Sequence, residues 1–449
     1  MVELRPSKIG MKRLALGLCL AGTVVVGCHS SSELPPGISP LAGLDPTLST
    51  DDLEPFAAMI DGASAVGLGE SVHTSGGYHQ ANYRLIRFLV ESQGFRVITL
   101  ETPRLDAEAA TAYVATCAGT VGGALKSIFP VFASSTFQDL FAWACQYNQQ
   151  HPGDPISFHG FDIQDPWSEG TALKSFFTKA AASDAAALSA ALDTCDGVPF
   201  TSANDYRANP NAFTVSADAY MSCQSAVATT RAYLAAHNAE LIAASSTDEV
   251  MLASMALRAI ETWEDQIFFR STDPARSLVA RDQGMADTFM ALRSLRFPTA
   301  KAILWAHDGH LMSHAQTAAG LFAEDGEMVM GTFLKEQLGD SYQAFALIGY
   351  QVDINWPGYA PTQCKELTPP TAPNAVENLL HALATPSLLI DLDFPGASTP
   401  FLDPALSYNL FDNDYDPPTV AMKPREQFRG LVYLDHSPAM QATQWSNCP

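Results

Sequence analysis

The sequence has few basic residues, and this shortage excludes one class of partner. It contains 25 lysines and arginines against 48 aspartates and glutamates, which gives a formal net charge of −23. A chain with this charge repels phosphate backbones, so we expect no nucleic-acid partner.

Several catalytic and binding motifs are missing as well. No predicted strand is followed by a Gly-x-Ser-x-Gly nucleophile elbow, by a phosphate-binding P-loop or by the glycine fingerprint of a dinucleotide-binding turn. The cysteines form no Cys-x-x-Cys pair, so a structural zinc site and a thioredoxin-like centre have no support. No segment repeats at a fixed period, which argues against a solenoid.

The amino end has the pattern of an export signal. Basic residues precede the apolar run "LALGLCLAGTVVV", which is too short to cross a bilayer as a permanent helix. The run ends in "VVGC", a box that resembles a bacterial lipoprotein cleavage site with Cys28 as the lipidated residue. We therefore expect a lipoprotein-type signal peptide at 1–28, a tether at 29–50, and a mature protein anchored in the bacterial cell envelope by a lipid on Cys28. Ordinary secretion, to the periplasm or the medium, is the alternative.

Six cysteines follow the signal segment. An even number of cysteines in an oxidising compartment predicts disulfides. We expect sequence neighbours to pair, which joins Cys117 with Cys145, Cys195 with Cys223, and Cys364 with Cys448.

Short apolar runs that end in polar residues recur along the domain expected at 51–449. They lie at 64–70, 95–101, 155–162 and 301–310, with further runs at 342–353, 387–394 and 429–436. A helical pattern that ends at Gly94 separates the first two runs. Nearly continuous apolar strands that alternate with helices are typical of a buried parallel sheet. We therefore predict an α/β fold, with a mostly parallel sheet flanked by helices and an Ala-rich helical insertion at about 171–265.

Polar side chains at the ends of these runs are the candidates for chemistry, because ligands of parallel α/β sheets bind beyond the carboxyl ends of the strands. They are Glu70 and His73 after the first run, Glu101 after the second, Asp162 after the third, and His307, Asp308 and His310 after the fourth. Taken singly, each has an ordinary structural explanation as a cap or an ion pair, and we interpret Asp162 as structural. Their coincidence at one sheet edge is what indicates a catalytic centre.

The order of several segments resembles one known family. "GLGE", "RLIRFLVE", "FRVITLE", "ISFHGFDIQ", "RDQGMAD" and "LWAHDGH" follow one another as in the erythromycin esterase family, over roughly residues 60–440. The resemblance implies hydrolysis of a carboxylic ester or lactone of the macrolide type, with no serine or cysteine nucleophile, and we expect no cofactor and no metal.

The resemblance also assigns roles to residues. It implies that His73 is the general base for water, supported by Glu70 and Glu101. His307 and His310 line the same pocket in this interpretation, and Arg281 of "RDQGMAD" lies near the site. A neutral imidazole with a pKa near neutrality is suited to taking a proton from an attacking water.

The sequence departs from the family pattern at three positions. Asn82 stands where the family has an arginine, and Phe132 and Thr136 stand where it has a tryptophan and a glutamate. The substrate, a small-molecule ester or lactone, is therefore left open. Two other functions fit the same residues: a metal- or haem-binding surface lipoprotein, because glutamate and histidine also bind zinc or iron, and a non-catalytic surface protein.

Overall fold

The computed structural model describes residues 34–196, 215–318, 328–356, 364–367, 369–396, 406–409 and 419–448. Pro35–Pro449 form one compact unit. The expected signal peptide at 1–28 lies outside the described residues. Within those residues, no helix combines the length and the apolar character that a bilayer crossing requires.

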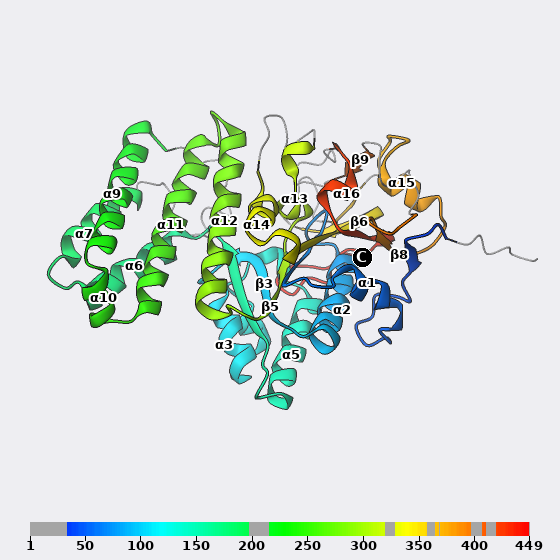
Figure 1. The fold of residues 1–449 in the computed structure, drawn as a ribbon, viewed down its shortest axis with the longest axis horizontal. Helices are drawn as coiled ribbons and strands as arrows, with labels where there is room; N and C mark the ends of the chain where they lie inside the picture. The colour runs from blue at the N-terminus through cyan, green and yellow to red at the C-terminus, as the bar shows by residue number, and fades with distance from the viewer. Residues whose placement is uncertain are drawn as a thin grey trace, which may run out of the picture. The chain divides into compact units, whose positions relative to one another are not determined.

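A mixed sheet forms the centre of the fold (Figure 1). Its described strands run in the order β1-β8-β11-β6-β2-β5-β3-β4, with β7 paired to β6. They are β1 (Ile38–Pro40), β2 (Ala65–Leu68), β3 (Phe95–Pro103), β4 (Ser157–Asp162), β5 (Lys301–Trp305), β6 (Tyr342–Asn355), β7 (Cys364–Leu367), β8 (Ser387–Asp391) and β11 (Gly430–Ser437). The pairings from β11 through β6, β2, β5 and β3 to β4 are parallel, whereas β1, β7 and β8 pair antiparallel. Each of the seven predicted apolar runs is a strand, and the α/β prediction is confirmed. A separate antiparallel pair consists of β9 (Leu406–Asn409) and β10 (Thr419–Met422).

Helices cover both faces of the sheet (Figure 1). One face carries α1 (Glu54–Met59), α2 (Gly76–Gln93), α3 (Glu108–Thr116) and α5 (Ser135–Gln150), and the short α4 (Val121–Ala124) contacts α3 and α5. The other carries α12 (Pro274–Arg296), α13 (Asp308–Leu311) and α14 (Met330–Leu338), and α15 (Val376–His381) and α16 (Pro424–Gln427) follow later in the chain.

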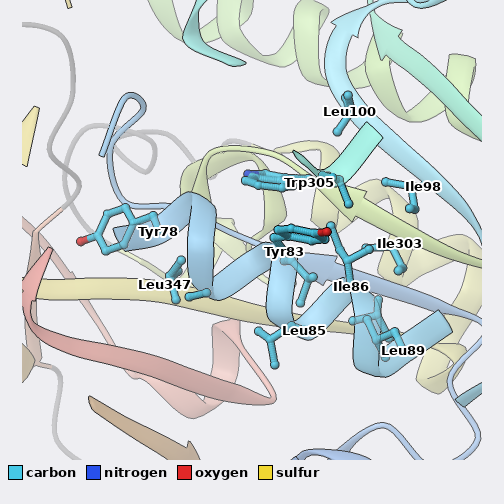
Figure 2. Packing of buried hydrophobic residues seen from close by; sticks show 14 of the residues in the cluster. Tyr78, Tyr83, Leu85, Ile86, Leu89, Ile98, Leu100, Ile303, Trp305 and Leu347 are labelled. Atoms are coloured by element: carbon cyan, nitrogen blue, oxygen red, sulfur yellow. The ribbon is translucent and has the colours of Figure 1, made fainter. Parts of the chain in front are cut away.

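Helix α2 connects the first two parallel strands and is buried along most of its length. It ends where predicted, at Gly94, whose φ of 76° is the left-handed conformation that glycine adopts at no steric cost. Figure 2 shows Ile86 and Leu89 of this helix beside Ile303 of β5, in a buried cluster that also includes Ile98 of β3 and Trp305 of β5. Burying each such aliphatic side chain contributes roughly 1.5–3 kcal/mol, so this layer fixes the helix against the middle of the sheet.

The residues described between β4 and β5 form helices and no strand, as the sequence predicts. They comprise α6 (Pro166–Ala180), α7 (Ala185–Leu192), α9 (Ala217–Ala236), α10 (Asn238–Ala244) and α11 (Thr247–Phe269), ahead of α12. These helices share an apolar core of their own. Helix α11 packs closely along α12, because Gly284 has no side chain to meet Thr262: a Cβ there would lie 2.5 Å from the threonine Oγ1. Through α12, which also contacts β4, the helical region reaches the sheet.

The expectation of a tether up to residue 50 is wrong for residues 35–50, which belong to the folded unit. Ile38–Pro40 add an edge strand to β8. Arg84 of α2 donates hydrogen bonds to the carbonyl oxygens of Gly43 and Ser49, and pairs with Asp52. A strand of three residues carries no periodic pattern, and the partners of this segment are distant in the sequence, so its composition alone suggested a linker.

All three expected disulfides are present in the structure. They join Cys117 to Cys145, Cys195 to Cys223 and Cys364 to Cys448. The first ties the end of α3 to α5, and the third ties β7 to the carboxyl-terminal segment.

Candidate active site

The predicted convergence at one sheet edge is present. Strands β2, β5, β3 and β4 are consecutive neighbours and parallel, so their carboxyl ends meet at the same edge. Glu70 follows β2, Glu101 lies near the end of β3, Asp162 ends β4, and His307 follows β5. These side chains are buried, and hydrogen bonds and ion pairs connect them to His73, Arg281 and His310.

His73 and Glu70 form the most closely spaced pair of the site. His73 Nδ1–H donates to Glu70 Oε1 across 2.6 Å, which leaves the lone pair of a neutral imidazole on Nε2. The Glu70 side chain is fully buried, whereas 16% of the His73 side chain is exposed. Burial lowers the pKa of His73, but the hydrogen bond to Glu70 and the negative charges of Glu101 and Glu70 outweigh burial, so the pKa is raised. This is an imidazole oriented by a carboxylate, as in hydrolase triads.

Arg281 links two acids from neighbouring strands. From α12, its guanidinium donates to Glu101 Oε1 at 2.7 Å and to both oxygens of Asp162, at 2.8 Å and 3.3 Å. Burial opposes ionisation of Glu101, but the charges of His310, Arg281 and His73 prevail and hold its pKa well below the ordinary value. Asp162, interpreted from the sequence as orienting its loop, does accept a hydrogen bond from its neighbour Ile163, and it also fixes Arg281.

His310 lies between two carboxylates. Its Nδ1–H donates to Asp282 Oδ1 at 2.8 Å, and its Nε2 lies 3.4 Å from Glu101 Oε1 and 3.1 Å from an Arg281 nitrogen. Burial and Arg281 lower the pKa of His310, but Asp282 and Glu101 dominate and raise it to about 10. The acids beside His310 therefore favour its charged form, and Arg281 adds a positive charge at the same place.

His307 is held by backbone groups at both nitrogens of its ring. Its Nδ1 accepts a hydrogen bond from the Gly309 amide, so the proton is on Nε2, which donates to the Ser71 carbonyl. The ring lies edge-on to His73, with 5.4 Å between the ring centroids. Both nitrogens are used within the protein, so His307 forms a wall of the site.

Asp308 lies beneath the site. Its amide donates to the Glu70 carbonyl, and its carboxyl group accepts from the Leu347 amide and from the Tyr408 hydroxyl. Burial raises its pKa well above the ordinary value. Among the polar residues predicted at this edge, Asp308 supports the turns and does not join the cluster around Arg281.

The turn that carries His73 is held by residues 437–448, which we call the C-terminal strap. Thr74 has a φ of 66°, a conformation that costs a β-branched residue on the order of 1–3 kcal/mol and persists only where neighbours impose it. Its carbonyl accepts from the Met440 amide at 3.1 Å, and the Gly76 amide donates to the Pro438 carbonyl at 2.6 Å. A Cβ on Gly76 would lie 2.8 Å from the strap backbone, so this close approach requires glycine.

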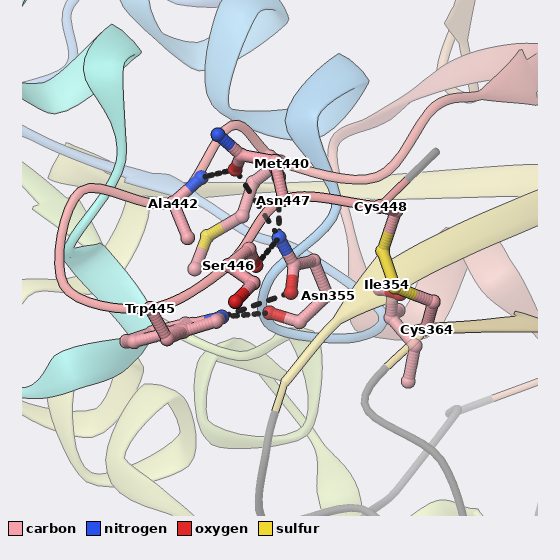
Figure 3. The surroundings of a disulfide bond; sticks show 9 residues. All are labelled: Ile354, Asn355, Cys364, Met440, Ala442, Trp445, Ser446, Asn447 and Cys448. Carbon is pink, nitrogen blue, oxygen red and sulfur yellow. Dashed lines mark hydrogen bonds between the residues drawn. A yellow bond between two sulfur atoms is a disulfide. The ribbon is translucent and has the colours of Figure 1, made fainter.

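Figure 3 shows how the C-terminal strap is fixed in turn. Asn355 lies at the end of β6, and its side-chain Nδ2 donates to the Met440 carbonyl at 3.1 Å. Trp445 Nε1–H donates to Asn355 Oδ1 at 2.9 Å. At the other end of the strap, a disulfide joins Cys448 to Cys364 of β7. The strap thus connects the end of β6 and the start of β7 to the turn of His73.

Some site residues were not predicted from the sequence. Asp282 follows Arg281 in "RDQGMAD", a place typical of a surface ion pair, yet it is buried and accepts a hydrogen bond from His310. His79, within the helical pattern after His73, also lies beside Glu70, with 3.7 Å between His79 Nε2 and Glu70 Oε2. Asn82, which replaces the family arginine, is buried and donates to the Gly69 carbonyl, immediately before Glu70.

The donor set does not fit a metal ion. Within the described ranges, no group of three or more His, Cys, Asp or Glu side chains is arranged to hold one. The nitrogens of His307 are used by the backbone, and His310 Nε2 faces the guanidinium cation of Arg281. The metal-binding alternative therefore gains no support from this geometry.

Fold and site together define an α/β protein with a buried histidine–carboxylate cluster at the carboxyl edge of its parallel strands. The erythromycin esterase family profile matches residues 90–437, and the chain belongs to this family. The matched range includes Glu101, Arg281 and His310 and begins after Glu70 and His73. Membership of the family indicates a hydrolase.

Relatives and solved structures agree with this assignment. The chain is 22% identical over 403 residues to the Bacillus subtilis (strain 168) protein called "Putative hydrolase YbfO", a match that covers 86% of this chain and 87% of the relative. A Bacillus cereus protein of known crystal structure shares the fold with a TM-score of 0.75 at 20% identity, covering 91% of this chain and 97% of that one. A mutant of the erythromycin esterase EreC, in its open conformation, has a TM-score of 0.69 at 21% identity, covering 91% and 99%.

Proposed function

We propose that this protein hydrolyses a carboxylic ester or lactone by activating water at His73. The observation that carries the proposal is the contact between His73 Nδ1 and the buried Glu70, which turns Nε2 away from the carboxylate. His73 is also more exposed than the other paired side chains of the site. An oriented, partly exposed base backed by a buried charge is the arrangement that general-base catalysis needs.

In this mechanism His73 Nε2 takes a proton from a water molecule while the water oxygen bonds to the carbonyl carbon. The carbonyl π bond breaks and its electrons form an oxyanion. When the tetrahedral intermediate collapses, the bond to the alkoxide oxygen breaks and the His73 imidazolium returns the proton to that oxygen. The products are an acid and an alcohol, or one hydroxy acid from a lactone, so the substrate gains one water.

Two groups are suited to stabilising the oxyanion. Arg281 is a cation held by Glu101 and Asp162, and Asp282 favours the charged form of His310. Preorganised positive charge is worth most where charge develops in the transition state. General-base catalysis contributes roughly 10²–10⁴-fold, so electrostatic stabilisation of this kind is needed in addition.

The first test is incubation of the pure protein with a panel of macrolides, simple lactones and carboxylic esters, followed by mass spectrometry. We propose macrolide lactones as one class of substrate because of the family membership. The expected result is a mass increase of one water for at least one member of the panel. If no ester or lactone reacts across the panel, the proposal is wrong.

The second test is His73→Ala. We expect hydrolysis to fall by at least two orders of magnitude while the thermal unfolding midpoint hardly changes, because the side chain is at the surface of the site. His381→Ala is the matched control: His381 also donates from Nδ1 to a carboxylate, Asp435, across 2.6 Å, but it is exposed and outside the site. Wild-type turnover in the His73 variant would exclude His73 as the base.

We also propose that the protein is exported and anchored through a lipid on Cys28. The short signal-like segment ending in "VVGC" and the three disulfides, which suit an oxidising compartment, support this location. Cys28→Ser should release the protein from the membrane fraction. Unchanged fractionation would contradict the lipid anchor.

A further inference from the structure

His79 is a buried histidine that the mechanism above does not use. It lies in the first turn of α2 and has no exposed surface. Its ring is edge-on to Phe137 and to Trp305, with centroid distances of 5.2 Å and 5.7 Å. Because these aromatic rings flank the imidazole, each of its two nitrogens has one polar group within reach.

One of these polar groups is Ser134 and the other is Glu70. His79 Nδ1 lies 3.0 Å from Ser134 Oγ, and His79 Nε2 lies 3.7 Å from Glu70 Oε2. Both Nε2 and Oε2 are buried and have no hydrogen-bond partner in the structure. Two unsatisfied polar atoms that face each other in an apolar enclosure each carry a desolvation cost that is relieved when they bond to one another.

The neighbours assign the proton of His79. Ser134 Oγ already accepts from the Phe137 amide as the cap of α5, so its hydroxyl hydrogen is available for His79 Nδ1. The imidazole proton is then on Nε2 and points to the carboxylate. The opposite tautomer would turn a nitrogen lone pair toward the negative charge of Glu70.

We propose that His79 is a positioning residue of the hydrolytic centre, whose Nε2–H holds Oε2 of Glu70 so that Oε1 stays aimed at His73. The inference rests on the proposed function of His73. The charged groups that face His79 are Glu70 and His73, and its other neighbours, Ser134, Phe137 and Trp305, are neutral.

His79 acts as a neutral donor. Burial lowers its pKa to about 4, with His73 acting in the same direction and Glu70 opposing it. A neutral donor leaves the full charge of Glu70 available to the imidazolium that forms on His73. The resting separation of 3.7 Å is longer than a hydrogen bond, and catalytic contacts are often long before the substrate binds and shorten in the complex.

The experiment compares His79→Gln, which keeps an N–H donor near the position of Nε2, with His79→Phe, which fills the same aromatic enclosure without a donor. The pKa of His73 is followed by NMR of ring-labelled histidine, and kcat and KM are measured across pH with an ester that the wild type hydrolyses. His159 on β4 is the matched control, because burial also lowers its pKa to about 4 and its partner is Ser157, outside the site. His159→Gln and His159→Phe should leave the pKa of His73 and the pH profile unchanged.

We expect His79→Phe to lower kcat by roughly 10- to 100-fold with little change in KM, which is the typical cost of losing a residue that orients an active-site side chain. The pKa of His73 should fall, because Glu70 Oε1 is no longer kept in hydrogen-bonding position to His73 Nδ1. The acid limb of the pH profile should therefore move to lower pH. His79→Gln should recover most of both effects. An unchanged His73 pKa in the Phe variant, or equal losses in the Gln and Phe variants, would overturn the inference.

Two further measurements keep the outcomes separable. If His79→Phe does not fold, Ser134→Ala tests the same chain of contacts, and it should lower the pKa of His73 in the same direction by a smaller amount. A folded Ser134→Ala protein with the wild-type pKa would then overturn the inference. The NMR titration needs no turnover, so it reports on His79 even if the panel of esters refutes the proposed function.

Discussion

Replacing Glu70 with glutamine removes the charge behind His73 and keeps the shape of the side chain. In the structure, Glu70 Oε1 accepts from His73 Nδ1 at 2.6 Å, deep enough that the carboxylate has no contact with solvent. A hydrogen bond to a charged group is worth about 1.5–3 kcal/mol, and two unit charges about 4 Å apart interact by about 4 kcal/mol at an effective dielectric constant of 20. We therefore expect the variant to lose roughly 3–5 kcal/mol of transition-state stabilisation, or about 10²- to 10⁴-fold in kcat at 1.36 kcal/mol per tenfold.

The substitution should also shift the pH dependence of hydrolysis in a definite direction. Glu70 is one of the groups that raise the pKa of His73, so Glu70→Gln should lower that pKa. Because the neutral imidazole is the active form, the acid limb of kcat/KM against pH should begin above 6.5 in the wild type and move to lower pH in the variant.

The assay is hydrolysis of one ester from pH 5 to 9, with thermal unfolding measured in parallel. Glu240→Gln is the matched control, because Glu240 accepts from His237 Nδ1 at 2.7 Å with the same spacing of three residues, but on the exposed surface of the helical region. The control should retain wild-type kinetics. A Glu70→Gln enzyme with wild-type kcat and an unmoved acid limb would refute the assignment of Glu70 as the partner of the base.

Three other changes test the support around the site. Arg281→Met should lower kcat by roughly 10²–10³-fold and reduce thermal stability, because the acids it bridges remain buried and uncompensated; unchanged kcat at saturating ester would exclude it from the transition state. Gly69→Ala should destabilise the fold by about 2 kcal/mol or more in denaturant unfolding, because the new Cβ would lie 1.7 Å from Asp308 Oδ1; a wild-type midpoint would contradict this. Cys364→Ser with Cys448→Ser opens a loop of 84 residues and should cost about 2–4 kcal/mol and lower kcat, whereas loss of the disulfide in the helical region should leave kcat unchanged; equal kcat in both would show that the strap does not support the base.

The sequence was sufficient for the parallel core because each buried strand is a continuous apolar run. The same logic located Glu70, Glu101 and His307, since a side chain that ends such a strand must lie at the carboxyl edge. Asp282 lies on a helix, where a carboxylate next to an arginine is the common pattern of an exposed surface, and only the packing of α12 turns it toward the site.

The contacts that hold the turn of His73 could not be predicted from the sequence, for another reason. Thr74 and its partner Met440 are separated by most of the chain, and the bond between them uses backbone atoms, which leave no trace in the choice of residue. Ile38–Pro40 were assigned to a linker because a short edge strand needs no pattern of its own. Local periodicity thus predicts strands and helices, whereas contacts through the backbone become visible only in three dimensions.

The C-terminal strap also sets the time at which the site is completed. His73 is translated well before Pro438 and Met440, whose backbone atoms bond to the turn that carries it. The disulfide that links Cys448 to Cys364 likewise forms only after both residues have been translated. A chain that has been translated only as far as its central strands therefore lacks the backbone contacts that hold the turn of His73.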